Sequence, residues 1–153
     1  MADQSGIVES LGTPYHIGLL VPNLEQAMAT LGIALGITWT ETYSVQVKDY
    51  GVRIVFSTQE PYLELCEGTD GSPWKCSSAG IELHHLGYWT DDYDKDAARL
   101  EKAGLAIEWN GSAEGLGRKV GYYRLPNEGG LIELVESTRK EWLDNLVRSA
   151  QAR

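Results

Sequence analysis

The chain has 153 residues, enough for one domain of ordinary size or two small fused halves, but not for two large independent domains. Hydrophobic residues make up 42% and charged residues 23%, a globular balance that excludes a disordered or fibrous chain. The formal net charge of -9 disfavours binding to nucleic acid or to an anionic membrane, and no apolar run could span a bilayer. We therefore expect a small-molecule partner.

The amino terminus and the cysteines favour a cytoplasmic protein. Residues 1–12 contain Asp3 and Glu9 and lack a cationic segment followed by an apolar core, so they do not resemble a signal peptide. Cys66 and Cys76 have no metal-type spacing and are too few for a disulfide framework. Both features fit a reducing compartment.

The first predicted element is a strand at residues 14–21, which are rich in Ile, Leu and Val. A helix should follow, with Asn23 as its N-cap, Gln26 as the partner of the cap, and apolar residues at helical spacing before Gly36. Three further strands are predicted at residues 38–47, 52–57 and 62–66. Together these elements form a βαβββ module at residues 14–68.

A second module is predicted at residues 83–136, after a linker at residues 69–82 that is rich in Gly and Ser. It contains a strand at residues 83–90, a helix at 92–102, and strands at 106–109, 119–125 and 131–135. The whole chain, residues 1–153, is thus expected to form a single domain of two modules.

A third helix is predicted at residues 138–150. Thr138 and Glu141 have the spacing of a capping box, and the apolar residues that follow form a stripe. The stripe includes Trp142, Leu143, Leu146 and Val147. The stripe could pack on its own domain or form a contact between two subunits. We expect the protein to be a homodimer.

An internal repeat supports the two modules, because three separate segments match at one offset of 69 residues. The segment that begins with Tyr15 and His16 recurs around His85, and the segment around Glu64 recurs around Glu133. The helix between them keeps the same register. We therefore expect an α+β fold in which two tandem βαβββ modules form a cupped, eight-stranded mixed sheet, followed by the C-terminal helix.

Strand parity places four chemically active side chains on one face of this sheet. Side chains alternate between the two faces of a strand, so His16 and Glu64 lie opposite the leucines that pack under the helix. His85 and Glu133 occupy the same positions in the second module. If the first and fourth strands of each module pair, the two modules bring all four groups to a common point.

This set of side chains is suited to a metal ion. Two neutral imidazoles and two carboxylates carry a charge of about -2, which one divalent cation cancels, and such mixed ligands favour Zn, Mn, Co, Ni or Fe over Ca or Mg. The sequence therefore predicts a divalent metal ion held by His16, Glu64, His85 and Glu133. His84 should point away from His85, as a surface residue or a neighbour of the ligands.

These residues resemble the vicinal oxygen chelate superfamily, which includes glyoxalase I, methylmalonyl-CoA epimerase, extradiol dioxygenases and bleomycin-resistance-type binding proteins. The resemblance covers residues 15–136 and is carried by residues 16–24, His85-Leu86-Gly87 and the strand ends at Glu64 and Glu133. It is nearest to the epimerase branch. It implies paired βαβββ modules around a divalent metal and substrates that chelate this metal or form a stabilised enolate.

The resemblance departs from the epimerase pattern at two positions. Glu64 stands where these epimerases usually have Gln, and Arg53 falls where the third strand usually carries a second carboxylate for proton transfer. An arginine stays protonated at neutral pH and cannot act as a base, but it could clamp a carboxylate or stabilise an oxyanion.

The resulting hypothesis is a metal-dependent isomerase or lyase acting on a small oxygenated carbonyl, acid or thioester. Glu133 is the candidate for proton transfer, Arg53 is a candidate anion clamp, and Tyr62 and Trp89 are candidates for lining the substrate cavity. The alternative is a metal-free protein of the bleomycin-resistance type that sequesters a small apolar compound. An extradiol dioxygenase is disfavoured because the chain has only three histidines.

Overall fold

The computed structural model describes residues 9–112, 119–127 and 129–153. The first half contains β1 (His16–Leu20), α1 (Leu24–Leu35), β2 (Tyr43–Val47), β3 (Tyr50–Phe56) and β4 (Tyr62–Gly68). The second half contains β5 (Glu82–Thr90), α2 (Tyr93–Lys102), β6 (Ala106–Ser112), β7 (Lys119–Arg124) and β8 (Leu131–Glu136). A short 3-10 turn, η1 (Ser137–Arg139), leads into the C-terminal helix α3 (Lys140–Gln151).

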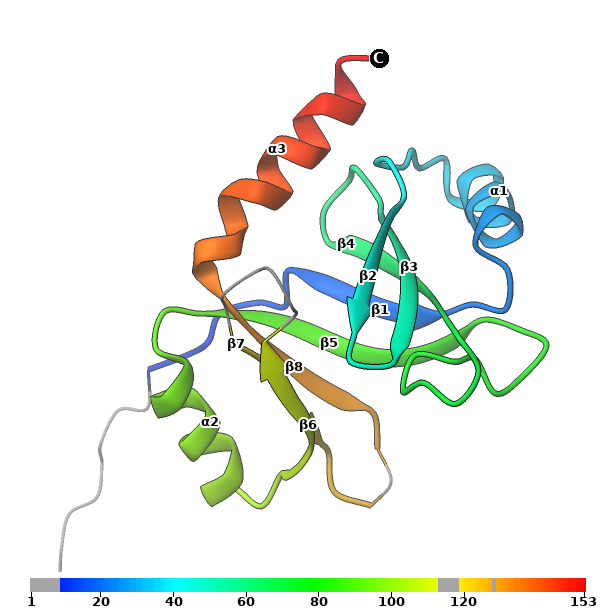
Figure 1. Cartoon of the computed structure of the whole chain (residues 1–153). Helices are drawn as coiled ribbons and strands as arrows, with labels where there is room; N and C mark the ends of the chain where they lie inside the picture. Colours follow the sequence, from blue (N-terminus) through cyan, green and yellow to red (C-terminus); the bar gives the residue numbers. More distant parts are fainter. Residues whose placement is uncertain (1–8, 113–118, 128) are drawn as a thin grey trace, which may run out of the picture.

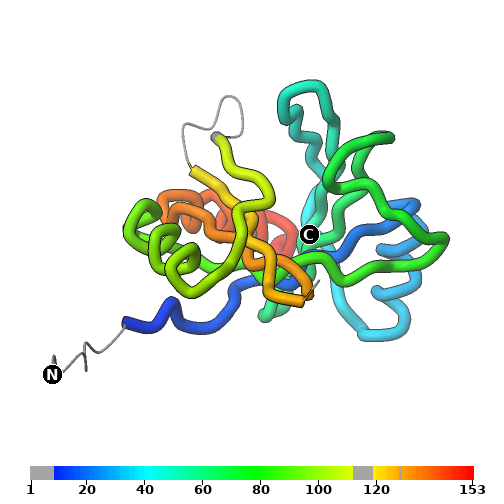
Figure 2. Tube along the Cα trace, turned by 90° about the horizontal axis from the view of Figure 1, so that it is seen from below, coloured from blue at the N-terminus to red at the C-terminus, as the bar shows by residue number. Residues whose placement is uncertain are grey.

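The strands form one mixed sheet in the order β2-β3-β4-β1-β5-β8-β7-β6. β1 pairs in parallel with β4, β5 pairs in parallel with β8, and the two halves join where β1 pairs antiparallel with β5. The predicted pairing of first and fourth strands is therefore confirmed, as is the α+β fold with a C-terminal helix. Seen from below, the two halves lie on opposite sides of the central strands (Figure 2).

The ends of the first helix are set by local sequence signals. The Asn23 side chain accepts a hydrogen bond from the backbone N–H of Gln26 at 2.8 Å, as predicted for an N-cap. Gly36 follows the helix with φ of 65°, a left-handed conformation that glycine adopts without steric cost. Both predicted boundaries of α1 are confirmed.

Each of the first two helices covers the outer face of its own half of the sheet (Figure 1). Leu24 and Ala27 of α1 pack against Val55 and Leu65, and α2 packs in the same way on β7 and β8. These are the strand positions opposite in parity to the four predicted ligands. The cup-facing side is thereby left to the polar groups and to the residues that surround them.

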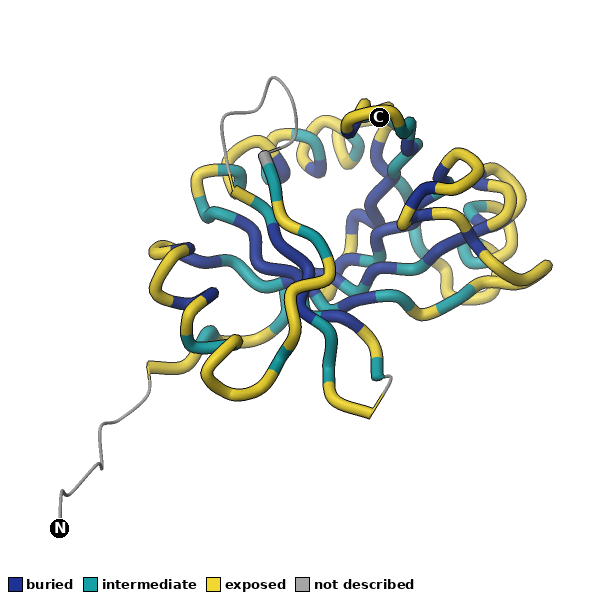
Figure 3. Tube along the Cα trace, turned by 60° about the horizontal axis from the view of Figure 1, so that its bottom comes forward, coloured by how far each residue is buried: buried dark blue, intermediate teal, exposed yellow. Residues whose placement is uncertain are grey.

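The C-terminal helix packs within its own chain and crosses from the second half to the first (Figure 1). Leu143 and Val147 are buried against Phe56 and Tyr62, on the face of the sheet that α1 does not cover. Buried positions follow the strands and the inward stripes of the helices, while helix backs and loops are exposed (Figure 3). The sequence left open whether the apolar stripe of this helix packs on its own domain or on a second subunit. Leu143 and Val147 of the stripe pack on their own domain.

Several predicted elements differ from the structure. The strand expected at residues 38–47 is shorter, because Trp39 makes only an isolated bridge with Ser57 before β2 begins. No side chain caps α3, because η1 extends the chain into it and replaces the expected capping box. The segment at residues 69–82 is also more than a connection, since it buries Trp74, whose carbonyl accepts from the backbone N–H of Gly68.

No helix in the described part of the chain is long and apolar enough to cross a membrane.

Candidate metal centre

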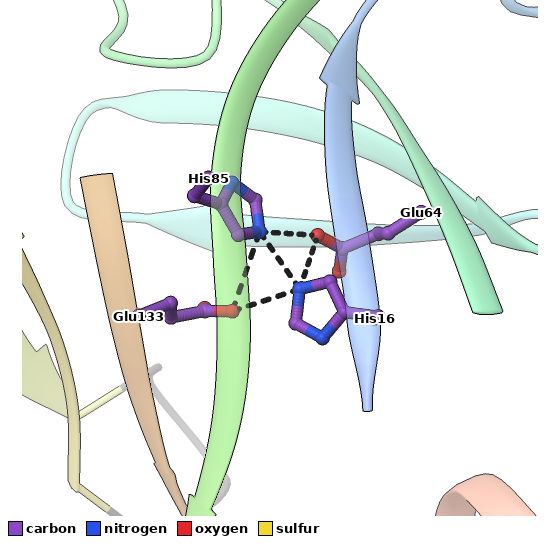
Figure 4. A group of neighbouring side chains, drawn as sticks. All are labelled: His16, Glu64, His85 and Glu133. Carbon is purple, nitrogen blue, oxygen red and sulfur yellow. Dashed lines mark hydrogen bonds and ion pairs between the residues drawn. The ribbon is translucent and has the colours of Figure 1, made fainter. Parts of the chain in front are cut away.

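Four side chains from the two halves converge beside the central strands (Figure 4). His16 Nε2 lies 3.0 Å from Glu133 Oε2 and 3.3 Å from Glu64 Oε2. His85 Nε2 lies 3.1 Å from Glu64 Oε2, 3.3 Å from Glu133 Oε2 and 2.7 Å from His16 Nε2. We call this group the quartet, and it joins residues that lie up to 117 positions apart, from 16 to 133.

Two glycines create the space in which the quartet assembles. Gly18 on β1 is in register with both His85 on β5 and Glu64 on β4, and Gly87 occupies the equivalent position between His16 and Glu133. A Cβ atom on Gly18 would lie 1.9 Å from the imidazole of His85, and one on Gly87 would lie 1.9 Å from that of His16. Each imidazole therefore lies directly over the glycine of the neighbouring strand.

The quartet is almost completely buried. His16 is 0% exposed, His85 1%, Glu133 6% and Glu64 7%. Burial of two carboxylates beside one another is costly unless positive charge is supplied. The arrangement is therefore stable only when protons on the imidazoles or a bound cation compensate the carboxylates.

The pKa values of His85 and Glu133 are shifted by the attraction between the imidazoles and the carboxylates. Burial by itself lowers the pKa of His85, but the charges of Glu133 and Glu64 and their hydrogen bonds outweigh it and raise that pKa to about 10. Burial by itself raises the pKa of Glu133, but the charges and hydrogen bonds of His85 and His16 lower it to about 2. Without metal, the centre therefore holds ionised carboxylates against protonated imidazole at neutral pH.

The donor geometry fits one divalent cation. Donor atoms about 2.0–2.2 Å from a shared ion and roughly at right angles or tetrahedral to one another lie about 3.0–3.4 Å apart. The four imidazole-to-carboxylate distances of 3.0–3.3 Å match this spacing, and the 2.7 Å between the Nε2 atoms of His16 and His85 is slightly shorter. Glu133 Oε2 is buried between the imidazoles of His16 and His85, at 3.0 Å and 3.3 Å, where a cation would lie. The quartet could thus hold one metal ion.

A bulge in β5 brings His84 to the quartet. The pairing of β1 with β5 shifts register after Gly18, so that His85 pairs with Gly18 while Leu83 pairs with Leu19. The extra residue at the bulge is His84, whose Nδ1 lies 2.9 Å from Nδ1 of His85. The expectation that His84 points away from His85 is wrong, because strict alternation of faces breaks down at a bulge.

We expect His84 to orient His85 for metal binding. When His85 Nε2 faces a cation, its Nδ1–H donates to the neutral imidazole of His84, which fixes the tautomer and the ring plane. His84→Phe should weaken zinc binding about 10-fold to 100-fold in competition with a chromophoric chelator. His84→Gln, which retains an acceptor, should recover part of the affinity. Equal affinity for wild type and His84→Phe would show that this contact does not orient the ligand.

A cavity of about 80 Å³ opens beside the quartet. Glu64 and Glu133 form its polar floor, and most of its wall is aliphatic or aromatic and comes from β2, β3, β7 and β8. The side chains of β3 that face this cavity are Val52, Ile54 and Phe56. The cavity therefore offers a small, mainly apolar space with direct access to two carboxylates.

The structure places Arg53 away from this cavity. Its guanidinium forms an ion pair with Glu25 on α1 and lies 3.3 Å from Glu67 Oε1, on the side of β3 that faces the helix. Glu67 in turn accepts from the backbone N–H of Leu24 at the start of α1. Arg53 thus ties β3 and β4 to α1, and it is not among the described residues that line the cavity.

Tyr62 and Trp89 lie on the predicted face but beside a different hollow, under α3. Both border the space between the sheet and Leu143, and neither lines the cavity at the quartet, whereas Tyr15 borders both spaces. Trp89 stacks on Tyr15 with ring centroids 3.7 Å apart. The structure therefore places these two aromatics behind Tyr15, not on the wall of the cavity.

Sequence reasoning missed most residues of the cavity wall. Trp74 from the segment between the modules donates its indole N–H to the Tyr122 hydroxyl at 3.2 Å, and both residues line the cavity with Arg139. Trp74 is a large aromatic within a Gly- and Ser-rich segment, which was the one available signal. Cys66 also lines the cavity, and its thiol lies 3.5 Å from Glu64 Oε2.

Comparisons with known proteins agree with this architecture. The sequence model of the glyoxalase/bleomycin resistance protein/dioxygenase superfamily matches residues 15–122. A comparison with curated proteins finds no significant match.

Solved structures with the same fold include two methylmalonyl-CoA epimerases. The enzyme from Streptomyces coelicolor, in complex with 2-nitronate-propionyl-CoA, superposes with a TM-score of 0.65 at 24% identity, covering 83% of this chain and 98% of that one. The enzyme from Mycobacterium tuberculosis gives a TM-score of 0.64 at 22% identity, covering 85% and 91%. A hypothetical protein from Bacillus halodurans gives 0.63 at 19%, covering 79% and 91%. These similarities establish the fold, and the family match shows that the chain belongs to the glyoxalase/bleomycin resistance protein/dioxygenase superfamily.

Proposed function

We propose that the protein is a metal-dependent isomerase or lyase that acts on a small oxygenated carbonyl compound, acid or thioester. The observation that carries this proposal is the buried quartet, which lies at the floor of a cavity large enough for a small molecule. The two free cysteines fit our expectation of a reducing, cytoplasmic location, and a homodimer stays part of the proposal.

His16, Glu64, His85 and Glu133 would hold the divalent ion, which we expect to be Zn, Mn, Co, Ni or Fe. When bound, this ion supplies Lewis-acid polarisation of a substrate oxygen and so stabilises negative charge next to the carbonyl carbon. Most of the cavity wall is apolar, and a substrate that fills the cavity would displace water from it, which strengthens electrostatic interactions inside.

Glu133 is the proposed proton-transfer residue. Its carboxylate is ionised at neutral pH, and its Oε2 is contacted by the imidazoles of His16 and His85. Glu64 Oε2, in contrast, is already contacted by the Cys66 thiol. Glu133 is therefore the less hydrogen-bonded of the two carboxylates, and we assign to it the transfer of a proton from carbon and its return.

The cavity contains no further carboxylate among its described lining residues besides Glu64 and Glu133. The side chains that β3 directs into it are apolar, so a separate base on this strand is absent from the described wall. We therefore propose proton transfer by a single carboxylate on one side of the substrate, in place of a pair of bases on opposite sides.

A metal-free sequestering protein explains the apolar wall but not the quartet. Burial of two carboxylates and two imidazoles at the floor of a binding cavity costs desolvation energy, and a protein that only encloses an apolar compound gains nothing from them.

The chemistry of the methylmalonyl-CoA epimerases, whose fold this chain shares, supports including thioesters among the candidate substrates.

The proposal is tested by proton exchange in deuterated water. With metal bound, the wild-type protein should exchange the hydrogen next to the carbonyl in at least one member of a panel of methylmalonyl-CoA, methylglyoxal hemithioacetal and small 2-oxo acids, followed by NMR. Glu133→Gln should slow this exchange by about 10²-fold to 10⁴-fold, the usual contribution of a general base.

Glu64→Gln is the matched control, because it removes the same charge from the same centre. It should retain metal and most of the exchange. An equal loss in the two variants would remove Glu133 from its role, and absence of exchange with every compound by metal-loaded wild type would contradict the proposed activity.

A further inference from the structure

We propose that Arg139 binds an anionic group of the substrate, so that the cavity selects compact apolar compounds that carry one carboxylate. This inference rests on the proposed function, since it names the class of molecule that the same cavity would receive. Arg139 is the last residue of η1, the turn that follows β8, and it lines the cavity whose floor contains Glu133. It is the one cationic side chain among the described lining residues.

The guanidinium of Arg139 is held in place by aromatic rings. It stacks 3.8 Å from the ring centroid of Trp142, and its Nη2 donates to the Tyr43 hydroxyl at 3.4 Å. Stacking fixes the plane of a guanidinium and leaves its edge, which carries the N–H donors, free to bind an anion in a bidentate manner. The orientation is therefore set before a ligand arrives.

No carboxylate of the described chain pairs with Arg139. Arg53, Arg99 and Arg124, by contrast, each form an ion pair with a glutamate or aspartate. A half-buried guanidinium with a single long hydrogen bond retains most of its five donors for another partner. The partner that matches these donors is a carboxylate or a comparable oxyanion.

The charge balance of the cavity also favours one anion. A divalent cation at the quartet cancels the charges of Glu64 and Glu133, because the coordinating imidazoles are neutral. Arg139 then leaves the cavity with one uncompensated positive charge. A ligand with a single negative group restores neutrality, whereas an uncharged ligand leaves the guanidinium to solvent.

The size of the cavity limits the body of the ligand. The cavity volume of about 80 Å³ is about half of the roughly 150 Å³ of an engineered cavity that encloses benzene, so the enclosed part of the ligand is limited to a handful of non-hydrogen atoms. Val45, Ile54 and Val135 supply an aliphatic wall for this body. The expected occupant is a short branched or cyclic acid, or the acyl part of a larger compound whose remainder extends into solvent.

The experiment compares 3-methylbutanoate with its uncharged amide, 3-methylbutanamide, by quenching of tryptophan fluorescence in zinc-loaded protein. Trp142 stacks on Arg139, and Trp74 and Trp109 line the cavity, so occupancy should change the emission. Arg139→Gln should weaken binding of the acid about 10-fold to 100-fold and leave binding of the amide within twofold. Arg53→Gln, the same change outside the cavity, should alter neither.

The titrations are repeated with metal-free protein, which separates this inference from the proposed function. Selective loss of acid binding in Arg139→Gln supports the anion site even if no proton exchange is found with any substrate. Equal weakening of acid and amide, or unchanged acid binding in Arg139→Gln, overturns it. Acid binding that disappears with the metal but not with Arg139 overturns it as well, because the carboxylate then binds the ion.

Discussion

Alanine at Gly18 or Gly87 is expected to abolish metal binding by the quartet. The new methyl group would lie 1.9 Å from the His85 or His16 imidazole, much closer than two non-bonded atoms can approach. The ring must leave its position over the neighbouring strand, and the donor atom moves away from the other three. We expect zinc affinity to fall more than 100-fold by calorimetric titration.

The same substitutions should also lower stability. Overpacking of a filled interior costs about 1–3 kcal/mol, and both glycines lie on the two central strands of the sheet. Gly51→Ala on β3 is the control, because its Cβ would meet Thr69 Cγ2 at 3.5 Å and Gln46 Oε1 at 3.7 Å, both ordinary contacts. Gly87→Ala that binds zinc like wild type would mean that His16 is not a ligand in the observed position.

Zinc affinity is expected to increase about tenfold per pH unit between pH 7 and 9. The pKa of His85 is raised to about 10 in the metal-free protein, so a cation must displace at least one proton from imidazole across this range. Glu133, whose pKa is lowered to about 2, is already ionised and contributes no proton. The measurement is a series of competition titrations with a chelator whose own protonation is known.

The stability of the metal-free protein should decrease as pH rises, whereas its affinity for zinc increases. A group whose pKa is raised by folding stabilises the native state below its unfolded pKa, here 6.5 for His85, and this stabilisation is lost as pH rises through about 10. The melting temperature of metal-free protein should therefore decrease from pH 7 to pH 10, while zinc-loaded protein should change less. An affinity for zinc that is flat with pH would show that the imidazoles are not protonated in the metal-free centre.

The repeat made the architecture predictable from the sequence. A constant offset relates His16 to His85 and Glu64 to Glu133, and the alternation of faces along a strand places each of them opposite the residues that pack under a helix. Both relations are local or periodic, so they need no knowledge of long-range contacts. The strand pairing and register then brought the four side chains within reach of one another.

The surroundings of the quartet were not predictable in the same way. The bulge that turns His84 toward His85 depends on how β1 and β5 pair, which no local pattern records. Arg53 has a residue type that suits an anion site, but strand parity directs it to α1, where it pairs with Glu25. Arg139 lies beyond the last strand, and only the path of η1 and α3 across the cup brings it to the cavity.

The most direct test of the account is the metal content of purified protein, measured by native mass spectrometry after equilibration with zinc. We predict one ion per chain in the wild type and none in His16→Ala, with circular dichroism showing that the variant keeps its sheet. Wild-type protein that binds no ion, or His16→Ala that retains one ion with unchanged affinity, would contradict the central claim that the two halves of the chain share a metal at the quartet.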